Sequence, residues 1–160
     1  MVIRKIKKEE IGFLSDMLYE ALFVPKEQTP LPKEIIQEPS LAKYVVHWGK
    51  DAFDLALVSE LDDELVGAVW GRLFDEANKG FGFVDHHTPE ISMAVKSAYR
   101  NKGMGTALLK AIATAYTTIG IKQLSLSVDK ANPAAQLYLR LGYEIVAETN
   151  TSWTMKLLLP

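Results

Sequence analysis

A short basic segment with two glycines is the part of the sequence best suited to chemistry. The segment Arg100–Gly105 (RNKGMG) lies between an apolar run typical of a strand and a long helical pattern. Without Cβ atoms, Gly103 and Gly105 let the backbone approach a ligand closely, and the N–H groups of a helix N-terminus attract anions. Arg100 and Lys102 add positive charge. The segment predicts a phosphate or pyrophosphate site; the plain alternative is a surface turn with a solvated basic pair.

Two common phosphate-binding loops do not fit this segment. The pattern G-x-x-x-x-G-K-S/T is absent from the chain, so the segment is not a P-loop. The dinucleotide pattern G-x-G-x-x-G fails because Leu108 stands where the third glycine is needed. A different phosphate-bearing ligand is expected.

The basic segment and a second motif downstream resemble the GNAT acetyltransferases. The family signature, Arg/Gln-x-x-Gly-x-Gly/Ala after a central strand, is matched by Arg100, Gly103 and Gly105. The family pattern of Asn, small residues and Tyr, followed by Gly-aromatic, is matched by residues 132–138 (NPAAQLY) and 141–143 (LGY). The resemblance is specific from the central strand to this second motif and only architectural before it.

The resemblance implies acetyl-CoA as the acetyl donor and a place for each part of it. In the family, the strand matching Glu90–Val95 diverges from the one matching Ile121–Val128, and the pantetheine arm lies in the gap. The resemblance assigns the pantetheine to the backbone at Met93, Ala94 and Val95. It assigns the pyrophosphate to Arg100, Asn101, Lys102, Gly103, Met104, Gly105 and Thr106. Asn132 would bind pantetheine or phosphate; its alternative is a helix N-cap, and one side chain can do both.

The chemistry implied is direct transfer of an acetyl group from a thioester to an amine. A backbone N–H near Val95 would stabilise the tetrahedral oxyanion. Tyr138 would return a proton to the departing thiolate, because a phenol with a pKa near ~10 is close to a thiol near ~8.5. The alternative for Tyr138 is a core aromatic residue packed beside Leu137 and Leu141.

A general base must remove the ammonium proton, and Glu90 is the leading candidate. We expect its carboxylate at the start of the central strand, at the mouth of the cleft. Asp85, His86 and His87 are alternatives, and a solvated loop position explains each of them at least as well. No metal site is expected, since cysteine is absent and adjacent histidines rarely face one ion together. His47 stands among apolar residues of a predicted helix and is assigned a structural role.

The elements that position these residues follow from the spacing of apolar side chains. Strands are predicted over residues 2–6, 53–61, 64–74, 90–95, 121–128, 143–147 and 152–159. Helices are predicted over residues 11–22, 40–48, 104–119 and 133–141. Residues 25–39, with four prolines, are predicted to be a surface excursion with at most a short helix, and residues 75–89 a long irregular connection. We expect one α/β (α+β) domain over residues 1–160, a GNAT-like mixed, mostly antiparallel sheet of about seven strands flanked by about four helices.

Composition limits the partners of the chain. Its 18 basic and 20 acidic side chains give a formal charge of −2, and the basic residues are scattered, so nucleic acid is not an expected partner. The absence of cysteine excludes a disulfide framework and a cysteine nucleophile, and it suits a cytoplasmic location. Charges interrupt residues 1–23, so neither a signal peptide nor a membrane partner is expected. The chain has the possibility of forming a homodimer, which its composition leaves open.

Two functions from different classes fit these residues. The first is an N-acetyltransferase that moves an acetyl group from acetyl-CoA to a primary amine of a small molecule. The second is a non-catalytic CoA-binding sensor or interaction module; Tyr138 favours the enzyme, because a binder does not need that hydroxyl. A longer acyl donor is a further alternative. Acidic residues between 75 and 90 favour a cationic acceptor, with a solvated acidic loop as the competing explanation, and residues 25–48 are expected to form the acceptor wall.

Overall fold

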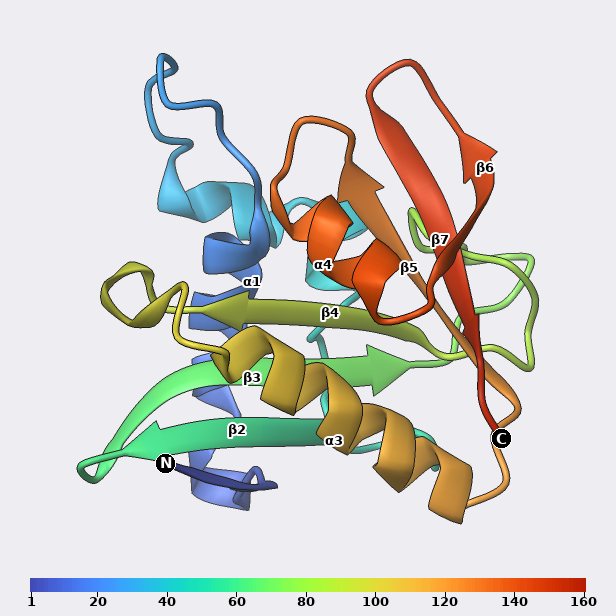
Figure 1. Cartoon of the computed structure of the whole chain (residues 1–160), viewed down its shortest axis with the longest axis horizontal. Helices are drawn as coiled ribbons and strands as arrows, with labels where there is room; N and C mark the ends of the chain where they lie inside the picture. The colour runs from blue at the N-terminus through green and yellow to red at the C-terminus, as the bar shows by residue number, and fades with distance from the viewer.

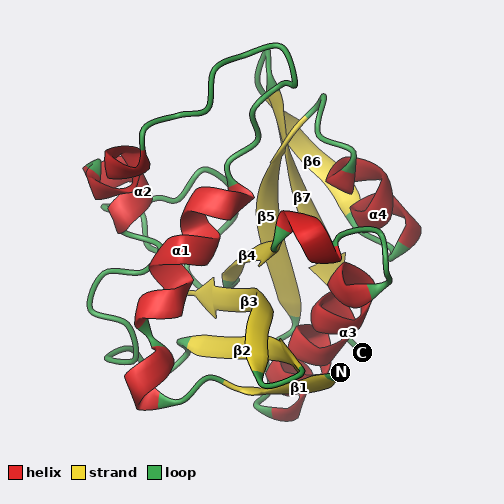
Figure 2. Cartoon of the chain, turned by 90° about the vertical axis from the view of Figure 1, so that its left-hand side faces the viewer, coloured by secondary structure: helices red, strands yellow, loops and turns green.

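The computed structural model describes residues 1–160, and its centre is one seven-stranded sheet with helices on both faces (Figures 1 and 2). The strands are β1 (Val2–Lys5), β2 (Leu55–Leu61), β3 (Glu64–Arg72), β4 (Glu90–Val95), β5 (Gln123–Asp129), β6 (Glu144–Glu148) and β7 (Ser152–Leu158). The α-helices are α1 (Gly12–Ala21), α2 (Pro39–Ala42), α3 (Met104–Thr118) and α4 (Ala134–Arg140). Short 3-10 helices are η1 (Lys8–Glu10), η2 (Lys33–Gln37) and η3 (Ser97–Tyr99). The expected fold class is confirmed.

The sheet is antiparallel except at one place. Its strand order is β1-β2-β3-β4-β5-β7-β6, and only β4 and β5 run parallel. These two strands share a single register pair, Glu90 with Ser125, next to a hydrogen bond from Ser125 N to Pro89 O of 3.0 Å. Figure 1 shows β4 running across the molecule while β5 rises away from it. The sheet is therefore open between β4 and β5 beyond their first residues.

Two apolar clusters cover the two faces of the sheet. The larger joins α3 and α4 to the sheet through residues such as Leu108, Ile112 and Leu126. The smaller packs α1 against β2, β3 and β4 through residues such as Leu14 and Trp70. Burying these side chains stabilises the fold by roughly 1.5–3 kcal/mol each. Figure 2 shows α1 and α2 on one side of the sheet and α3 and α4 on the other.

Local backbone geometry explains why most predicted boundaries are right. Asp62 and Asp63 both have positive φ, 51° and 63°, as the tight turn of a two-residue hairpin requires. Gly120 and Gly142 have φ of 88° and 97° and follow the ends of α3 and α4, where a left-handed residue stops a helix. None of the helices has the length and apolar character needed to cross a membrane.

The helix predicted over residues 40–48 is wrong in extent, because α2 ends at Ala42 and turns follow it. The carbonyl oxygens of Lys43 and Val46 accept hydrogen bonds from Arg72 of β3, at 2.9 and 2.7 Å, so they do not continue the helix. His47, which we expected on that helix, is exposed and has a φ of 52°. A tertiary contact overrides the local pattern here.

Candidate active site

The gap between β4 and β5 leaves backbone groups without strand partners. Lys96 N donates to Val66 O of β3 at 2.8 Å, and backbone groups of successive strand residues point to opposite sides. The N–H groups of Met93 and Val95 therefore point away from β3, into the gap. Ala94 does not share this orientation: it pairs with Ala68 and its methyl group is buried. Of the three predicted pantetheine residues, two present their backbone to the gap.

The loop after β4 presents free amide groups at the start of α3. Asn101 and Gly103 are left-handed, with φ of 62° and 79°. The first helical hydrogen bond runs from Ala107 N to Gly103 O at 3.1 Å, so the amides of residues 104–106 have no partner in the helix. A Cβ on Gly103 would have no heavy atom within 4 Å. This open, amide-lined end of a 15-residue helix can accept an anion.

Gly105 has a different environment from Gly103. A Cβ on Gly105 would lie 3.2 Å from Met93 Cε and 3.4 Å from Leu137 Cδ2. The second glycine of the motif therefore lets α3 pack closely against β4 and α4. Its role in the structure is internal packing, and the open space lies at Gly103.

Arg100 contacts protein groups at two points. Its Nε donates to Val95 O at 2.9 Å, and its Nη2 lies 3.4 Å from Glu20 of α1. The pair is half exposed, with side-chain exposures of 48% for Arg100 and 38% for Glu20, so it contributes little to stability. The carbonyl of Val95 is thus occupied, while no hydrogen bond engages its N–H group. Lys102 is exposed beside this loop.

Asn132 is an N-terminal cap of α4. Its Oδ1 accepts a hydrogen bond from Ala134 N at 2.9 Å. This is the capping role that we kept as an alternative. The side-chain amide nitrogen makes no hydrogen bond within the chain, so it can still donate to a ligand.

Tyr138 lies on α4, which Figure 1 shows beside β5 and above β4. Its ring packs edge-on against Tyr143, with centroids 5.7 Å apart. Burial raises the pKa of Tyr138 to about 12. The expected value near 10 is therefore wrong, and the phenol stays protonated throughout the neutral range. Tyr143 has a buried hydroxyl without a partner, and burial likewise raises its pKa.

Glu90 is buried, contrary to the expectation that it opens at the mouth of the cleft. Only 4% of the residue is exposed. Its Oε2 accepts a hydrogen bond from Tyr44, while its Oε1 has no partner. Gly80 covers Oε1 so closely that a Cβ there would lie 2.2 Å away. Burial raises the pKa of Glu90 to about 7, opposed by Tyr44, the Gly82 amide and the charge of Lys43.

The other proposed bases lie in the loop before β4. Asp85 accepts hydrogen bonds from His87 N and Thr88 Oγ1, both at 2.8 Å, as a turn residue does. Burial alone would raise the pKa of Asp85, but these hydrogen bonds and the two neighbouring histidines lower it. His86 and His87 are exposed, with ring centroids 3.9 Å apart. No group of three His, Cys, Asp or Glu side chains is arranged to hold a metal ion.

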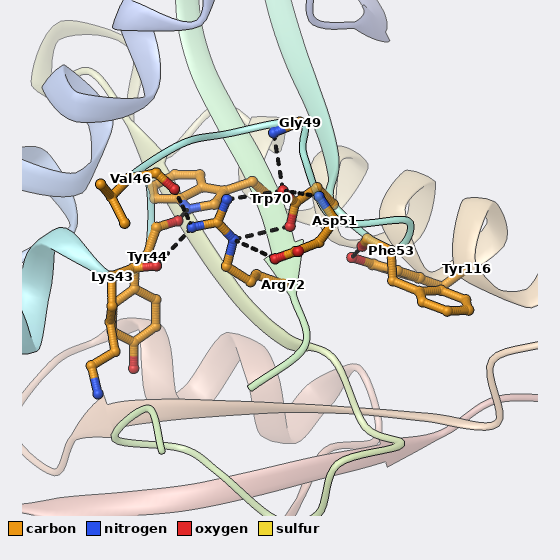
Figure 3. A network of polar contacts seen from close by, with 10 residues as sticks. Lys43, Tyr44, Val46, Gly49, Asp51, Phe53, Trp70, Arg72 and Tyr116 are labelled. Atoms are coloured by element: carbon orange, nitrogen blue, oxygen red, sulfur yellow. Dashed lines mark hydrogen bonds and ion pairs between the residues drawn. The ribbon is translucent and has the colours of Figure 1, made fainter. Parts of the chain in front are cut away.

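A buried arginine that the sequence analysis did not select fixes the surroundings of Glu90. Arg72 lies opposite Glu90 in the β3–β4 register and forms two hydrogen bonds of 2.9 Å with the carboxylate of Asp54. The same guanidinium donates hydrogen bonds to the carbonyl oxygens of Lys43 and Val46 (Figure 3). It also lies 4.8 Å from the ring of Trp48. The sequence does contain one signal for this residue, an arginine directly after the apolar run 65–71.

This network places Tyr44 over Glu90. Trp70 Nε1 donates to Tyr44 O at 3.2 Å, and Arg72 holds the residues on either side of Tyr44. Figure 3 shows the Tyr44 ring directed away from the arginine cluster, with its hydroxyl at the far end. That hydroxyl donates to Glu90 and accepts a hydrogen bond of 2.7 Å from Phe81 N.

Known proteins resemble this chain in sequence or in fold. An uncharacterized N-acetyltransferase of Methanocaldococcus jannaschii is 29% identical over 145 residues, which are 89% of this chain and 78% of that protein. The PaiA N-acetyltransferase of Thermoplasma acidophilum, solved with coenzyme A, has a TM-score of 0.71 at 17% identity, covering 97% of this chain and 96% of that one. The putative acetyltransferase YncA of Salmonella typhimurium, solved with acetyl-CoA, has a TM-score of 0.69 at 19% identity, covering 100% and 94%.

The match to a family is direct at the level of sequence. The pattern of the acetyltransferase (GNAT) family covers residues 16–143, which include the open β4–β5 gap, the amide-lined start of α3 and the α4 motif. This chain therefore belongs to the GNAT family of acetyltransferases.

Proposed function

We propose that this acetyl-CoA-dependent N-acetyltransferase acetylates a primary amine of a small molecule by direct transfer. The observation that carries the proposal is the combination, along β4, of free strand amides at its open end, a free helix N-terminus after it and a buried carboxylate at its paired first residue. Two structures of similar fold were solved with coenzyme A or acetyl-CoA, which supports the donor. The cytoplasm is the compartment we propose, on the grounds given by the sequence.

The residues present fit an acetyl-CoA molecule. The amides of residues 104–106, the open space at Gly103 and the charge of Lys102 would hold the pyrophosphate. The backbone of Met93 and the amide nitrogen of Asn132 would bind the pantetheine arm. Arg100 would reach the pyrophosphate by leaving Glu20, at a small cost because that pair is half exposed.

Three groups would carry the reaction. Glu90 would accept a proton from the acceptor ammonium, and its pKa of about 7 suits a base at neutral pH. The amine nitrogen then bonds to the thioester carbon, and the N–H of Val95 would stabilise the oxyanion. The C–S bond breaks, and Tyr138 would donate a hydrogen bond to the thiolate as it forms. The products are an amide, the free thiol of CoA and one proton.

The acid role of Tyr138 is limited by its burial. With a pKa of about 12, it is a much weaker acid than a thiol near ~8.5, so full transfer of its proton to the thiolate is unfavourable. A hydrogen bond to the thiolate, with the final proton taken from water, is the contribution that this environment allows.

Calorimetry and turnover together test the proposal. CoA should bind the isolated protein and raise its melting temperature, because a ligand of the folded state stabilises it. Acetyl-CoA with a panel of small primary amines should give N-acetyl products. Binding of CoA without turnover of any amine would support the non-catalytic sensor. If calorimetry detects no binding of CoA, both the enzyme and the sensor are contradicted.

A further inference from the structure

The base and the amides that face the gap lie at different ends of β4. Glu90 is the first residue of the strand and is paired with Ser125, whereas the N–H groups that point into the gap belong to Met93 and Val95. A strand rises ~3.3 Å per residue, so these two residues lie about 10 and 16 Å from Glu90 along the strand. The side chain of Glu90 is too short to reach an amine held there. A proton from that amine therefore has to pass through another group.

Ser92 lies between the two ends, on the same face of the sheet as Glu90. Val95 belongs to the cluster beneath α3 and α4, whereas Ala94 belongs to the cluster beneath α1. Side chains alternate along a strand, so Glu90, Ser92 and Ala94 share the face that α1 covers. The hydrogen bond between Glu90 and Tyr44, a member of the cluster beneath α1, agrees with this assignment. Beyond Glu90, Ser92 is the only polar side chain of β4 on this face.

The hydroxyl of Ser92 is available for a relay. It makes no hydrogen bond within the chain, and the residue is half-buried rather than sealed in the core. Its register partner is Trp70 of β3, whose Nε1 already donates to Tyr44 O. The next side chain on this face, the methyl group of Ala94, can neither donate nor accept. A serine hydroxyl does both at once, as the transfer of a proton from one group to the next requires.

The carboxylate of Glu90 has one oxygen left for the proton. Its Oε2 accepts a hydrogen bond from Tyr44, while Oε1 is buried and has no partner. Arg72, opposite Glu90 in the register, is paired with Asp54, and the ammonium of Lys43 donates to a backbone carbonyl. Buried polar atoms are nearly always satisfied, so Oε1 lacks a donor that the reaction can supply.

We propose that Ser92 relays the proton from the acceptor ammonium in the gap to Glu90 Oε1. The ammonium gives one proton to Ser92 Oγ, in contact or through one water, as Ser92 passes its own hydroxyl proton to Oε1. The carboxylate becomes a carboxylic acid, the amine becomes neutral and Ser92 is unchanged. The freed electron pair of the nitrogen then forms the bond to the thioester carbon. This inference rests on the proposed function and adds a residue to its mechanism.

Turnover of acetyl-CoA with n-butylamine tests the relay. Ser92→Ala removes only a hydroxyl, so kcat near pH 7 should fall about ten- to 100-fold, because water replaces part of the relay. The KM for acetyl-CoA and the melting temperature should change little. Ser92→Thr keeps a hydroxyl and should recover most of the turnover. Ser59→Ala is the matched control, since it removes a buried, unpartnered hydroxyl from β2 and should leave kcat unchanged.

Two further measurements separate a relay from a structural role. If Ser92 acts only through Glu90, adding Ser92→Ala to Glu90→Gln should cause no further loss of kcat. Raising the pH deprotonates the free amine, whose pKa is near ~10.4 as for lysine. The deficit of Ser92→Ala relative to wild type should therefore shrink as the pH rises from about 7 toward that value.

The outcomes distinguish the relay from the base. A kcat for Ser92→Ala equal to that of wild type, beside a slow Glu90→Gln, would overturn the relay and leave the base standing. Losses that add in the double variant, or a deficit independent of pH, would also overturn it. Equal turnover by Glu90→Gln and wild type would contradict the base in the proposed function together with the relay.

Discussion

At the scale of single residues, the balance around Glu90 determines the chemistry. Burial favours the neutral acid, whereas the hydrogen bond from Tyr44, the Gly82 amide and the charge of Lys43 favour the carboxylate. The result is a pKa of about 7, so the group can both take up and release a proton at neutral pH. Tyr44 sets this balance from a segment remote in sequence.

The titration of Glu90 gives the first prediction. The carboxyl 13C resonance of Glu90 should titrate with a midpoint near pH 7 in the wild-type protein. Tyr44→Phe removes a hydrogen bond that favours the carboxylate, so the midpoint should move to higher pH and activity near pH 7 should fall. A wild-type midpoint at the ordinary value of 4.5 would contradict the burial of this group.

Tyr138 gives the second prediction. Tyr138→Phe keeps the ring against Tyr143 and removes the hydroxyl, so stability and CoA affinity should change little. A charge-assisted hydrogen bond to the forming thiolate is worth about 1.5–3 kcal/mol, so turnover should fall at least about tenfold. The measurement uses a slow donor, for which chemistry limits the rate. Equal turnover by the two proteins would assign Tyr138 to the core.

At the scale of elements, the two glycines at the start of α3 have separate roles. Gly103 is left-handed and borders open space, whereas Gly105 packs against Met93 and Leu137. Gly103→Val should therefore reduce CoA affinity about tenfold or more, the cost of losing a charge-assisted hydrogen bond and straining the turn. Gly105→Val should mainly lower the melting temperature.

Calorimetry with CoA and thermal unfolding of both variants separate these roles. The control is Gly12→Val, since Gly12 also has nothing within 4 Å of a Cβ but lies on α1. Wild-type CoA affinity in a folded Gly103→Val protein would count against the anion site at this helix.

Regular elements were predictable from the sequence because their signals are local. The alternation and periodicity in β4, α3 and α4 depend on which side chains face the core, and glycines mark where α3 and α4 end. The end of α2 was not predictable, since Arg72 binds its following carbonyls from β3. The burial of Glu90 depends on Tyr44 and Gly80, and no pattern within the chain indicates those contacts.

At the scale of the whole molecule, β4 and β5 diverge, and the opening between them connects the two faces of the sheet. These faces carry different chemical groups. The face with α3 and α4 presents Tyr138 and the amide-lined helix start, while the face with α1 presents Glu90 beneath Tyr44. A donor and an acceptor can meet from opposite sides only where the sheet is open. Keeping a buried carboxylate at the paired start of β4, next to that opening, lowers the stability of the folded state.

The whole-molecule prediction concerns the free energy of unfolding, which this buried carboxylate lowers. Because the pKa of Glu90 is raised from 4.5 to about 7, the folded state binds a proton in this range that the unfolded state has lost. Stability should therefore fall as the pH rises from about 4.5 through 7. Glu90→Gln should be more stable than wild type at pH 8, by up to about 3 kcal/mol, and should lack this part of the pH dependence. Urea unfolding at pH 5 and 8 measures both; a variant less stable than wild type at pH 8 would contradict the account.

The most direct test of the central claim is acetyl transfer by wild-type protein and by Glu90→Gln, followed by mass spectrometry of the amine and thiol release from CoA. With acetyl-CoA and a small primary amine, the wild-type protein should produce N-acetyl amine and free CoA in equal amounts. Glu90→Gln should bind CoA with unchanged affinity. Its turnover should be about 10²-fold slower, or slower still, as expected for loss of a general base. Thiol release without acetylated amine, or equal turnover by the two proteins, would contradict transfer to an amine at Glu90.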